Sequence, residues 1–517
     1  MNDSPLILTF DFGTQSVRAS LFDTTGACLA FEQAKYEPAY YSPKPGYAEM
    51  DPNYYYECLC QCTKALANKN PELIKRVAGM ELDCFRDSAV LLDKDRNVIR
   101  PMILWLDSRM AKCQEPLPFL SRAIFRLVGM QEVIRMNRRR TMANWIKENE
   151  PENFAKIDKY VSISTYFVYR LTGELKDSPS DFTGHYPIDY KKKSWYKDPM
   201  NHFQGCIFSI RKDQLVELVD TQGELGRLSK KASEETGLPE GLILYAGGSD
   251  KSCETLGSGV FNDSMCAISL GTACTIETVT EKYTEPIKFF PAYPSIQPGV
   301  FNMDVQIYRG FWMINWFLKE FGAYKIDDLI ATDVSPEEYN RKLPEISAGS
   351  DGLLLQPFWG SPLDRPEVKG AMIGFADYIT KEHFYKAIIE GIFFELLLSK
   401  KGFQKKLGHD FKAIRISGGG SRSDEICQIA ADMFGIPVEK VQTNETSSLG
   451  AAIGGFLSIG QFKTVEEAVA SMVHVTKRFE PNVENHVVYE DLFENVYKKL
   501  YPSLKDVYRY LYQKAQQ

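Results

Sequence analysis

The sequence predicts an α/β protein built from two similar halves. Segments with strand character alternate with segments of helical character along all 517 residues, as is typical of the α/β class. A hairpin rich in glycine and hydroxyl residues around Gly13-Thr14 has a counterpart around Gly271-Thr272, about half the chain length away. A repeat at that distance indicates an internal duplication in which each half opens with a Gly-Thr hairpin.

The first hairpin consists of strands at residues 6–10 and 17–22, joined by a polar turn. Glycine at such a turn lets backbone N–H groups approach an anion, and the hydroxyls add donors. Asp11 lies at a strand end, where a carboxylate can hold a cation, and Arg18 can meet phosphate oxygens. Alone, these residues favour an ordinary hairpin turn. The second copy favours a polyphosphate held from both sides.

Two charged segments follow apolar strands in the first half. Arg86-Asp87 follows one, and Asp107 and Arg109 follow the next, just after Trp105. Arginine and aspartate at strand ends suit a ligand rich in hydroxyl groups. Structural ion pairs are the alternative interpretation.

The seam between the halves follows a strand predicted at residues 242–246. We place the boundary there, with a first domain at residues 1–253 and a second at residues 254–517. Asp250, in Gly247-Gly248-Ser249-Asp250-Lys251, stands directly after this strand. A carboxylate between two domains can accept a proton from a substrate hydroxyl during phosphoryl transfer. It can also cap the helix that follows, and the two roles are compatible.

The second half contains a strand at residues 413–416 that leads into Gly418-Gly419-Gly420 and a helix at 423–434. A nucleotide commonly lies against the backbone of such a turn, although a plain strand–helix turn is the alternative. The spacing is not that of a dinucleotide fingerprint, and no P-loop motif occurs. Further elements are predicted in the same way: a strand at 438–441, helices at 390–400 and 447–459, and a helical tail at 487–517 whose aromatics form a docking face.

Composition and charge exclude several classes of protein. The chain is 44% apolar and 25% charged, as ordinary globular proteins are. Its net charge of −7 argues against a partner that is nucleic acid or a membrane surface. No apolar stretch reaches the roughly 20 residues of a membrane span, and the first residues lack the basic region of a signal peptide. Eleven cysteines without a disulfide-like pattern lead us to expect free thiols in a reducing cytoplasm.

Together these motifs resemble the FGGY family of carbohydrate kinases, which belongs to the actin-like, ribonuclease H-like ATPase superfamily. The resemblance covers nearly the whole chain in the family's order. Its most specific part extends from Gly418 through Asp432 and Gly435 to Gly450-Ala451-Ala452, the family's adenosine site. It implies two ribonuclease H-like domains flanking a catalytic cleft. It also implies ATP-dependent phosphorylation of a hydroxyl on a small sugar, polyol or sugar acid, with Mg²⁺ as the metal.

The resemblance also assigns roles to residues of this sequence. Asp250 matches the family's catalytic base, and Asp11 would lie near Mg²⁺. The residues expected to bind ATP are Gly13, Thr14, Gln15, Ser16, Arg18, Gly271, Thr272, Gly310, Gly418, Gly419, Gly420 and Ser423. The residues expected to bind the sugar are Arg86, Asp87, Trp105, Asp107, Arg109, Asn137 and Lys251.

The chain departs from the two best-known branches of the family at the sugar side. Arg86-Asp87 replaces the Met-His usual in xylulokinases and is nearer the Arg-Glu of glycerol kinases, and Asn137 stands where glycerol kinases have tyrosine. Lys251 has no evident partner in the sequence. It can lower the pKa of Asp250, neutralise phosphate charge or meet a substrate carboxylate, and the last option makes a sugar acid plausible.

Two other classes of function stay open at this point. One is a non-metabolic actin-like ATPase that uses nucleotide as a switch for a chaperone or filament. The other is a sugar-binding regulator that has lost catalysis. ATP turnover with and without sugars separates them from a kinase. For the assembly, a homodimer is one option.

Overall fold

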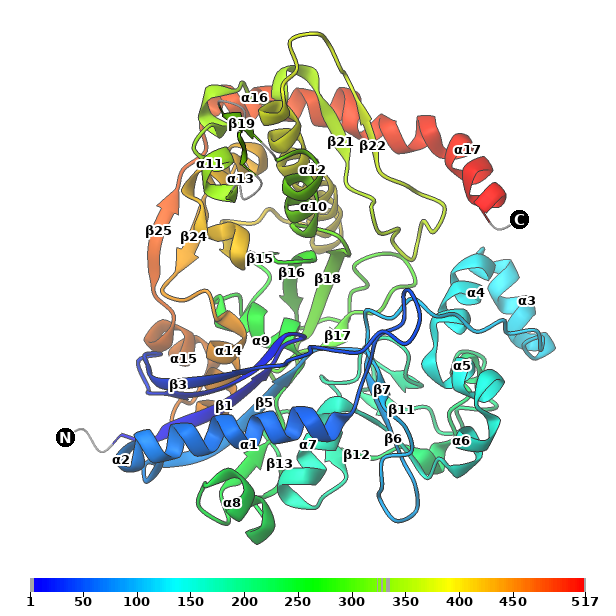
Figure 1. Ribbon diagram of the computed structural model, residues 1–517, viewed down its shortest axis with the longest axis vertical. Coiled ribbons are helices and arrows are strands. Elements are labelled where there is room, and N and C mark those ends of the chain that lie inside the picture. The colour runs from blue at the N-terminus through cyan, green and yellow to red at the C-terminus, as the bar shows by residue number, and fades with distance from the viewer. Residues whose placement is uncertain (1–3, 323, 327–328, 332–334, 516–517) are drawn as a thin grey trace.

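Two twisted sheets, one in each half of the chain, form the framework of the molecule (Figure 1). The computed structural model describes residues 4–322, 324–326, 329–331 and 335–515. The first sheet has the strand order β13-β14-β5-β1-β2-β3 and comprises β1 (Leu6–Phe12), β2 (Ser16–Phe22), β3 (Cys28–Lys35), β5 (Val77–Cys84), β13 (Glu224–Arg227) and β14 (Ile243–Tyr245). The second has the order β17-β18-β16-β15-β23-β24-β25 and comprises β15 (Cys266–Leu270), β16 (Cys274–Thr280), β17 (Tyr293–Pro294), β18 (Phe301–Ile307), β23 (Ile414–Ser417), β24 (Val438–Val441) and β25 (Val475–Phe479).

Both sheets have the same topology around their first hairpin. In the first half β1 pairs antiparallel with β2 and β2 with β3, while β5 adds parallel to β1 on the other side. In the second half β15, β16 and β18 form the same antiparallel series, and β23 adds parallel to β15. The α/β class is confirmed, and the repeated topology agrees with the predicted duplication.

Smaller sheets and the helices complete each half. The short strands are β4 (Glu49–Met50), β6 (Ala89–Leu92), β7 (Met102–Ile103), β8 (Lys159–Ser162), β9 (Lys176–Asp177), β10 (Ile188–Asp189), β11 (Ser194–Trp195), β12 (Glu217–Leu218), β19 (Tyr324–Ile326), β20 (Leu329–Ala331), β21 (Leu354–Gln356) and β22 (Ala371–Ile373). The helices of the first half are α1 (Pro52–Lys69), α2 (Pro71–Ile74), α3 (Phe119–Leu127), α4 (Gln131–Arg140), α5 (Met142–Asn149), α6 (Pro151–Lys156), α7 (Ile163–Thr172), α8 (Lys230–Thr236) and α9 (Asp250–Gly257). Those of the second half are α10 (Trp312–Phe321), α11 (Pro336–Asn340), α12 (Lys381–Leu407), α13 (Asp424–Phe434), α14 (Thr446–Ser458), α15 (Val465–Met472), α16 (Val483–Leu492) and α17 (Lys498–Ala515).

The helical tail packs through its aromatic residues, as predicted. A short π-helical segment, Phe493–Tyr497, joins α16 to α17. Tyr489, Phe493, Tyr497 and Tyr508 are each at most 4% exposed, so they form the docking face of the tail. Residues 516 and 517 of the predicted tail lie outside the described residues. None of the described helices combines the length and apolar character needed to cross a membrane.

The two halves meet through α9 and α14, which lie between the two sheets (Figure 1). The helices approach so closely that a Cβ on Gly257 would stand 1.9 Å from the Thr446 oxygen. A Cβ on Gly450 would stand 1.8 Å from the Cys253 oxygen, so glycine at both positions permits the contact. A separate apolar cluster joins these helices to the first sheet. The predicted boundary between residues 253 and 254 falls within α9 and stays a prediction.

Candidate active site

The first Gly-Thr turn lies between β1 and β2. The Gly13 N–H donates to the Ser16 oxygen at 3.0 Å, and the Gln15 oxygen accepts the Tyr36 N–H. The Thr14 hydroxyl accepts a hydrogen bond from the indole Nε1 of Trp105 at 3.1 Å. The Thr14 N–H has no acceptor among the described residues. The turn therefore keeps a backbone donor unpaired in the protein, as an anion site requires.

Asp11, at the end of β1, links the two halves of the chain. Its Oδ2 lies 3.4 Å from Nη1 of Arg18 and accepts the Ser448 hydroxyl of α14 at 3.3 Å. The Arg18 guanidinium also forms an ion pair with Glu445, the residue that precedes α14. Arg18, expected to bind phosphate, is therefore engaged by two protein carboxylates in this structure.

Asp83 stands beside Asp11 in the parallel register of β5 and β1 and escaped the sequence analysis. It is fully buried, and neither carboxyl oxygen has a hydrogen-bond partner among the described residues. Burial and the nearby Asp11, Asp250 and Asp181 raise the pKa of Asp83 well above its usual range. The signal for it was present: Glu81 and Asp83 alternate with apolar residues in an otherwise buried strand.

Asp250 is the first residue of α9 and follows the N-cap residue Ser249, so the capping role considered for Asp250 is not what the structure shows. Its Oδ1 accepts the Lys251 N–H at 2.8 Å and lies 3.8 Å from Nε of Arg86. Its side chain is 31% exposed, so the carboxylate is open on one side. Burial raises the pKa of Asp250, while the cations of Arg86 and Lys251 oppose that rise. The charges of Asp11 and Asp250 both raise the pKa of Asp83, so the two carboxylates lie near this buried residue.

Lys251 does have a partner, and this corrects the expectation that its charge is unpaired. Its Nζ forms an ion pair with Glu254 one turn further along α9 and lies 3.4 Å from the Ser269 hydroxyl of β15. The second oxygen of Glu254 accepts the Ser417 hydroxyl of β23 at 2.7 Å. Lys251 therefore ties α9 to the second sheet. The argument for a sugar acid, which rested on a free lysine, loses its basis.

Arg86 and Asp87, expected to bind the sugar, follow β5, and Arg86 lies beside Asp250. Arg86 Nη1 lies 2.6 Å from Oδ2 of Asp304, a residue of β18 in the second half, and the guanidinium lies 5.7 Å from the ring centre of Tyr293. Asp87 has a left-handed backbone with φ 57°, and its carboxylate lies 2.7 Å from Nδ1 of His185. Asp304 and His185 were missed because both are distant in sequence from the motifs they join.

Asp107 and Arg109 form the structural ion pair that was the alternative interpretation. Two nitrogens of Arg109 lie 2.8 and 2.7 Å from the two oxygens of Asp107, and a third lies 2.7 Å from Glu49. The Arg109 guanidinium also lies 3.9 Å from the ring centre of Tyr47. The two side chains are only 3% and 2% exposed, so neither is open to a ligand. Asn137 lies on α4, with a buried Oδ1 that has no partner among the described residues.

The second Gly-Thr turn is backed by the start of α10. The oxygens of Gly271 and Thr272 accept the N–H groups of Phe311 and Trp312 at 3.0 and 3.3 Å. Gly310 packs onto this turn so closely that a Cβ would stand 2.3 Å from the Cys274 sulfur. The Thr272 N–H, like that of Thr14, has no acceptor among the described residues.

The glycine-rich turn joins β23 to α13. Gly418 has φ 82°, a left-handed conformation that favours glycine, and a Cβ on Gly420 would stand 2.4 Å from the Phe311 ring. A Cβ on Gly419 would meet nothing within 4 Å, so this residue faces open space. Ser423 caps α13 by accepting the Ile426 N–H.

These two sheets with facing helices and paired turns define the two-domain actin-like ATPase fold. Comparison with known families gives the assignment within that fold. The model of the N-terminal domain of the FGGY family of carbohydrate kinases matches residues 6–257, and that of the C-terminal domain matches residues 266–459. The chain belongs to the FGGY family of carbohydrate kinases. It is a phosphotransferase with an alcohol group as acceptor, and family membership implies ATP as the phosphoryl donor.

Relatives include proteins named xylulose kinase and gluconokinase. The chain is 27% identical over 509 residues to a xylulose kinase of Lactococcus lactis, covering 97% of each protein. It is 24% identical over 494 residues to a gluconokinase of Bacillus subtilis, covering 94% of each. The fold matches a ligand-bound xylulose kinase of Lactobacillus acidophilus with a TM-score of 0.83 at 20% identity, covering 98% of this chain and 100% of that one. The comparisons favour a kinase over a nucleotide switch or a silent regulator.

Proposed function

We propose that Asp250 is the general base that accepts the proton of the sugar hydroxyl as the γ-phosphoryl group is transferred. The observation that carries this proposal is the place of Asp250 at the start of α9, beside Arg86 and close to the same buried Asp83 as Asp11. Burial makes the carboxylate a stronger base than an exposed one. Arg86 and Lys251 favour its ionised form, which is the form that accepts a proton.

The two turns supply donors for the phosphate groups in this proposal. The N–H groups of Thr14 and Thr272 have no protein acceptor among the described residues, which supports a role in binding phosphate oxygens. Preorganised backbone donors of this kind stabilise the charge of a transferring phosphoryl group. The adenosine would lie at the open side of Gly419. The other residues proposed to contact ATP are Gly13, Gln15, Ser16, Gly271, Gly310, Gly418, Gly420 and Ser423. Arg18 would contribute indirectly, by holding the carboxylates of Asp11 and Glu445 in place.

The residues around Asp11 fit Mg²⁺ that is held mainly by phosphate and water. Asp11 accepts only long contacts, and the neighbouring Asp83 has two carboxyl oxygens without a partner among the described residues. No group of three or more His, Cys, Asp or Glu side chains suited to a metal occurs in the described part of the chain. Mg²⁺ commonly takes one or two carboxylates together with substrate phosphates. Asp11 would hold it there, and the ion would neutralise phosphate charge.

The sugar would be bound by side chains from both halves. His185 donates through Nδ1 to the Asp87 carboxylate, and its buried Nε2 has no partner among the described residues. A sugar hydroxyl, which can donate or accept a hydrogen bond, is a suitable partner for this nitrogen. Arg86, Trp105 and Asn137 stay proposed sugar residues, while Asp107 and Arg109 would act as structural support. Lys251 would position α9.

We infer that the substrate is an uncharged sugar or polyol. Arg86 is balanced by Asp304 and Asp250, and Lys251 by Glu254, so neither cation is left over for a substrate carboxylate. The relatives named xylulose kinase are compatible with this choice. A screen of pentuloses, alditols and aldonates, read by ADP release, tests it. We expect turnover with pentuloses or alditols. Turnover of aldonates alone would overturn the inference.

Two wider expectations stay proposals. The eleven cysteines are all free, which supports a reducing compartment such as the cytoplasm. A homodimer is testable by sedimentation equilibrium on the full chain.

A further inference from the structure

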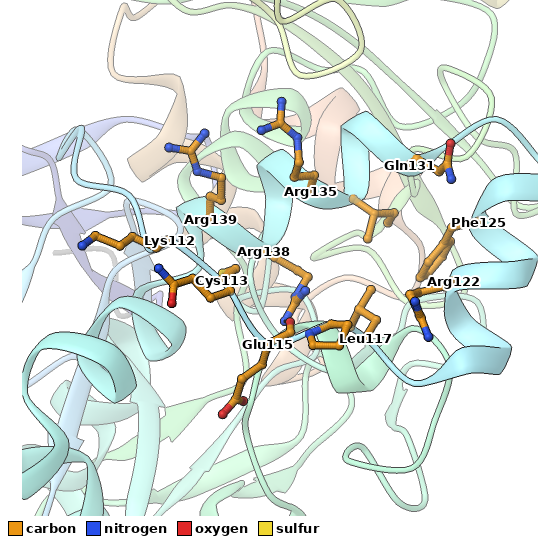
Figure 2. A pocket seen from close by; sticks show the side chains of 13 residues that line it. Lys112, Cys113, Glu115, Leu117, Arg122, Phe125, Gln131, Arg135, Arg138 and Arg139 are labelled. Carbon is orange, nitrogen blue, oxygen red and sulfur yellow. The ribbon is translucent and has the colours of Figure 1, made fainter. Parts of the chain in front are cut away.

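A cavity of about 590 Å³ lies between residues 112–117, α3 and α4, and none of the active-site residues named above lines it (Figure 2). Its wall beside α5 is held in place by Glu148, whose carboxylate accepts the N–H groups of Lys112 and Cys113 at 2.7 and 2.6 Å. Cavities of this size accommodate small organic ligands.

The lining of the cavity is strongly basic. It contains five cationic side chains, Lys112, Arg122, Arg135, Arg138 and Arg139, and one carboxylate, Glu115. Arg135 pairs with Glu132 at 2.6 Å, and Glu115 lies 3.1 Å from Lys147 outside the cavity. No described carboxylate lies within 4 Å of the other four cations. The cavity therefore carries positive charge that the protein does not balance locally.

Arg138 is the most informative of these cations. It is half-buried, its Nη2 donates to the Glu115 backbone oxygen at 3.0 Å, and its buried Nε has no partner among the described residues. Figure 2 shows its side chain reaching toward the Glu115–Leu117 segment, while Arg122 comes from α3. A desolvated cation without a counter-charge is unfavourable, and a bound anion would remove that cost.

The cavity also has an apolar part. Leu117 and Phe125 are 9% and 5% exposed, and Ile134 is half-buried beside them. An arginine guanidinium matches phosphate oxygens in a two-point arrangement, and the apolar side chains suit a carbon skeleton. We propose that this cavity is a binding site for a small organic phosphate, separate from the ATP and sugar sites.

The test uses phenyl phosphate as probe and is measured by titration calorimetry on the full chain. Inorganic phosphate is the control for the charge and benzyl alcohol the uncharged aromatic control. We expect phenyl phosphate to bind more tightly than either. Arg138→Gln and Arg122→Gln should each weaken its binding by about tenfold or more, the size of a lost charge-assisted hydrogen bond. The Arg122 side chain is exposed and makes no hydrogen bond or ion pair with the described residues, so its variant is expected to fold normally.

Arg126→Gln is the matched control. Arg126 is exposed on the same helix as Arg122 and does not line the cavity, so its variant should bind phenyl phosphate as the wild type does. Equal affinity in all three variants would place the probe elsewhere and overturn the proposal. Binding of phenyl phosphate no tighter than that of inorganic phosphate or benzyl alcohol would overturn it as well.

Discussion

Arg86 and Asp304, which come from opposite halves of the chain, lie 2.6 Å apart between guanidinium and carboxylate. Arg86 also faces Asp250, at 3.8 Å. One arginine therefore connects the proposed base to a strand of the second sheet. Because both ends of this contact are mostly buried, at 15% and 13% exposure, solvent screens it little.

Asp304→Asn should shift the acid limb of the pH profile of kcat/KM to lower pH. Without Asp304 the Arg86 guanidinium acts on Asp250 alone and lowers its pKa. Initial rates of ADP release across pH measure the shift. Asp304→Glu keeps the charge and should leave the limb in place. If the acid limb of the Asp304→Asn profile stays at the wild-type pH, Arg86 does not influence the pKa of the catalytic base, and this part of the account is wrong.

Gly419→Val should weaken ATP binding by about tenfold or more and leave sugar binding and the melting temperature nearly unchanged. Its Cβ meets no protein atom within 4 Å, so the added methyls enter the space assigned to adenosine. Gly402→Ala, where a Cβ is also unopposed, is the control and should bind ATP normally. An equal loss of sugar affinity would contradict the placement of the nucleotide.

Lys251→Met should lower the free energy of unfolding by about 3–5 kcal/mol, because it leaves the Glu254 carboxylate buried without its partner. Adding Glu254→Gln should recover much of that loss, which urea unfolding of the single and double variants measures. Any loss of kcat/KM should be alike for neutral and acidic sugars. If kcat/KM falls only for sugar acids, Lys251 contacts a substrate carboxylate, which would contradict its role as a residue that positions α9.

Glu277→Gln should stabilise the protein at pH 8 and have little effect at pH 5. Burial raises the pKa of Glu277 from 4.5 to about 7, against the pull of Lys251. The folded protein therefore binds this proton more tightly than the unfolded chain, and the free energy of unfolding falls as pH rises from about 4.5 to about 7. The variant lacks this dependence. Melting temperatures of the wild type and the variant at pH 5 and pH 8 measure the effect. The same difference in melting temperature at both pH values would contradict the raised pKa of Glu277.

The sequence predicted the framework because hairpins, glycine turns and strand–helix alternation are local patterns. Asp250 was singled out by its position after a strand, and in the structure it is the first residue of α9, beside Arg86. The partners of these residues were not predictable in the same way. Asp304 and His185 approach Arg86 and Asp87 only through the fold. Glu254 is the exception, because it follows Lys251 by three residues on one helix, a spacing at which opposite charges pair. Asp107 and Arg109 were singled out for sugar binding, but they form a buried ion pair with each other. Charged residues at a strand end therefore do not by themselves distinguish a binding site from a structural ion pair.

The most direct test of the account is the rate of phosphoryl transfer in Asp250→Asn. The variant removes the proton acceptor and keeps the size of the side chain and the Oδ1 acceptor for the Lys251 N–H. We predict that kcat falls by ~10²-fold or more, the usual contribution of a general base, while the dissociation constant of ATP changes little. A kcat within a few-fold of the wild type would contradict the account, because the proton acceptor would then be another group.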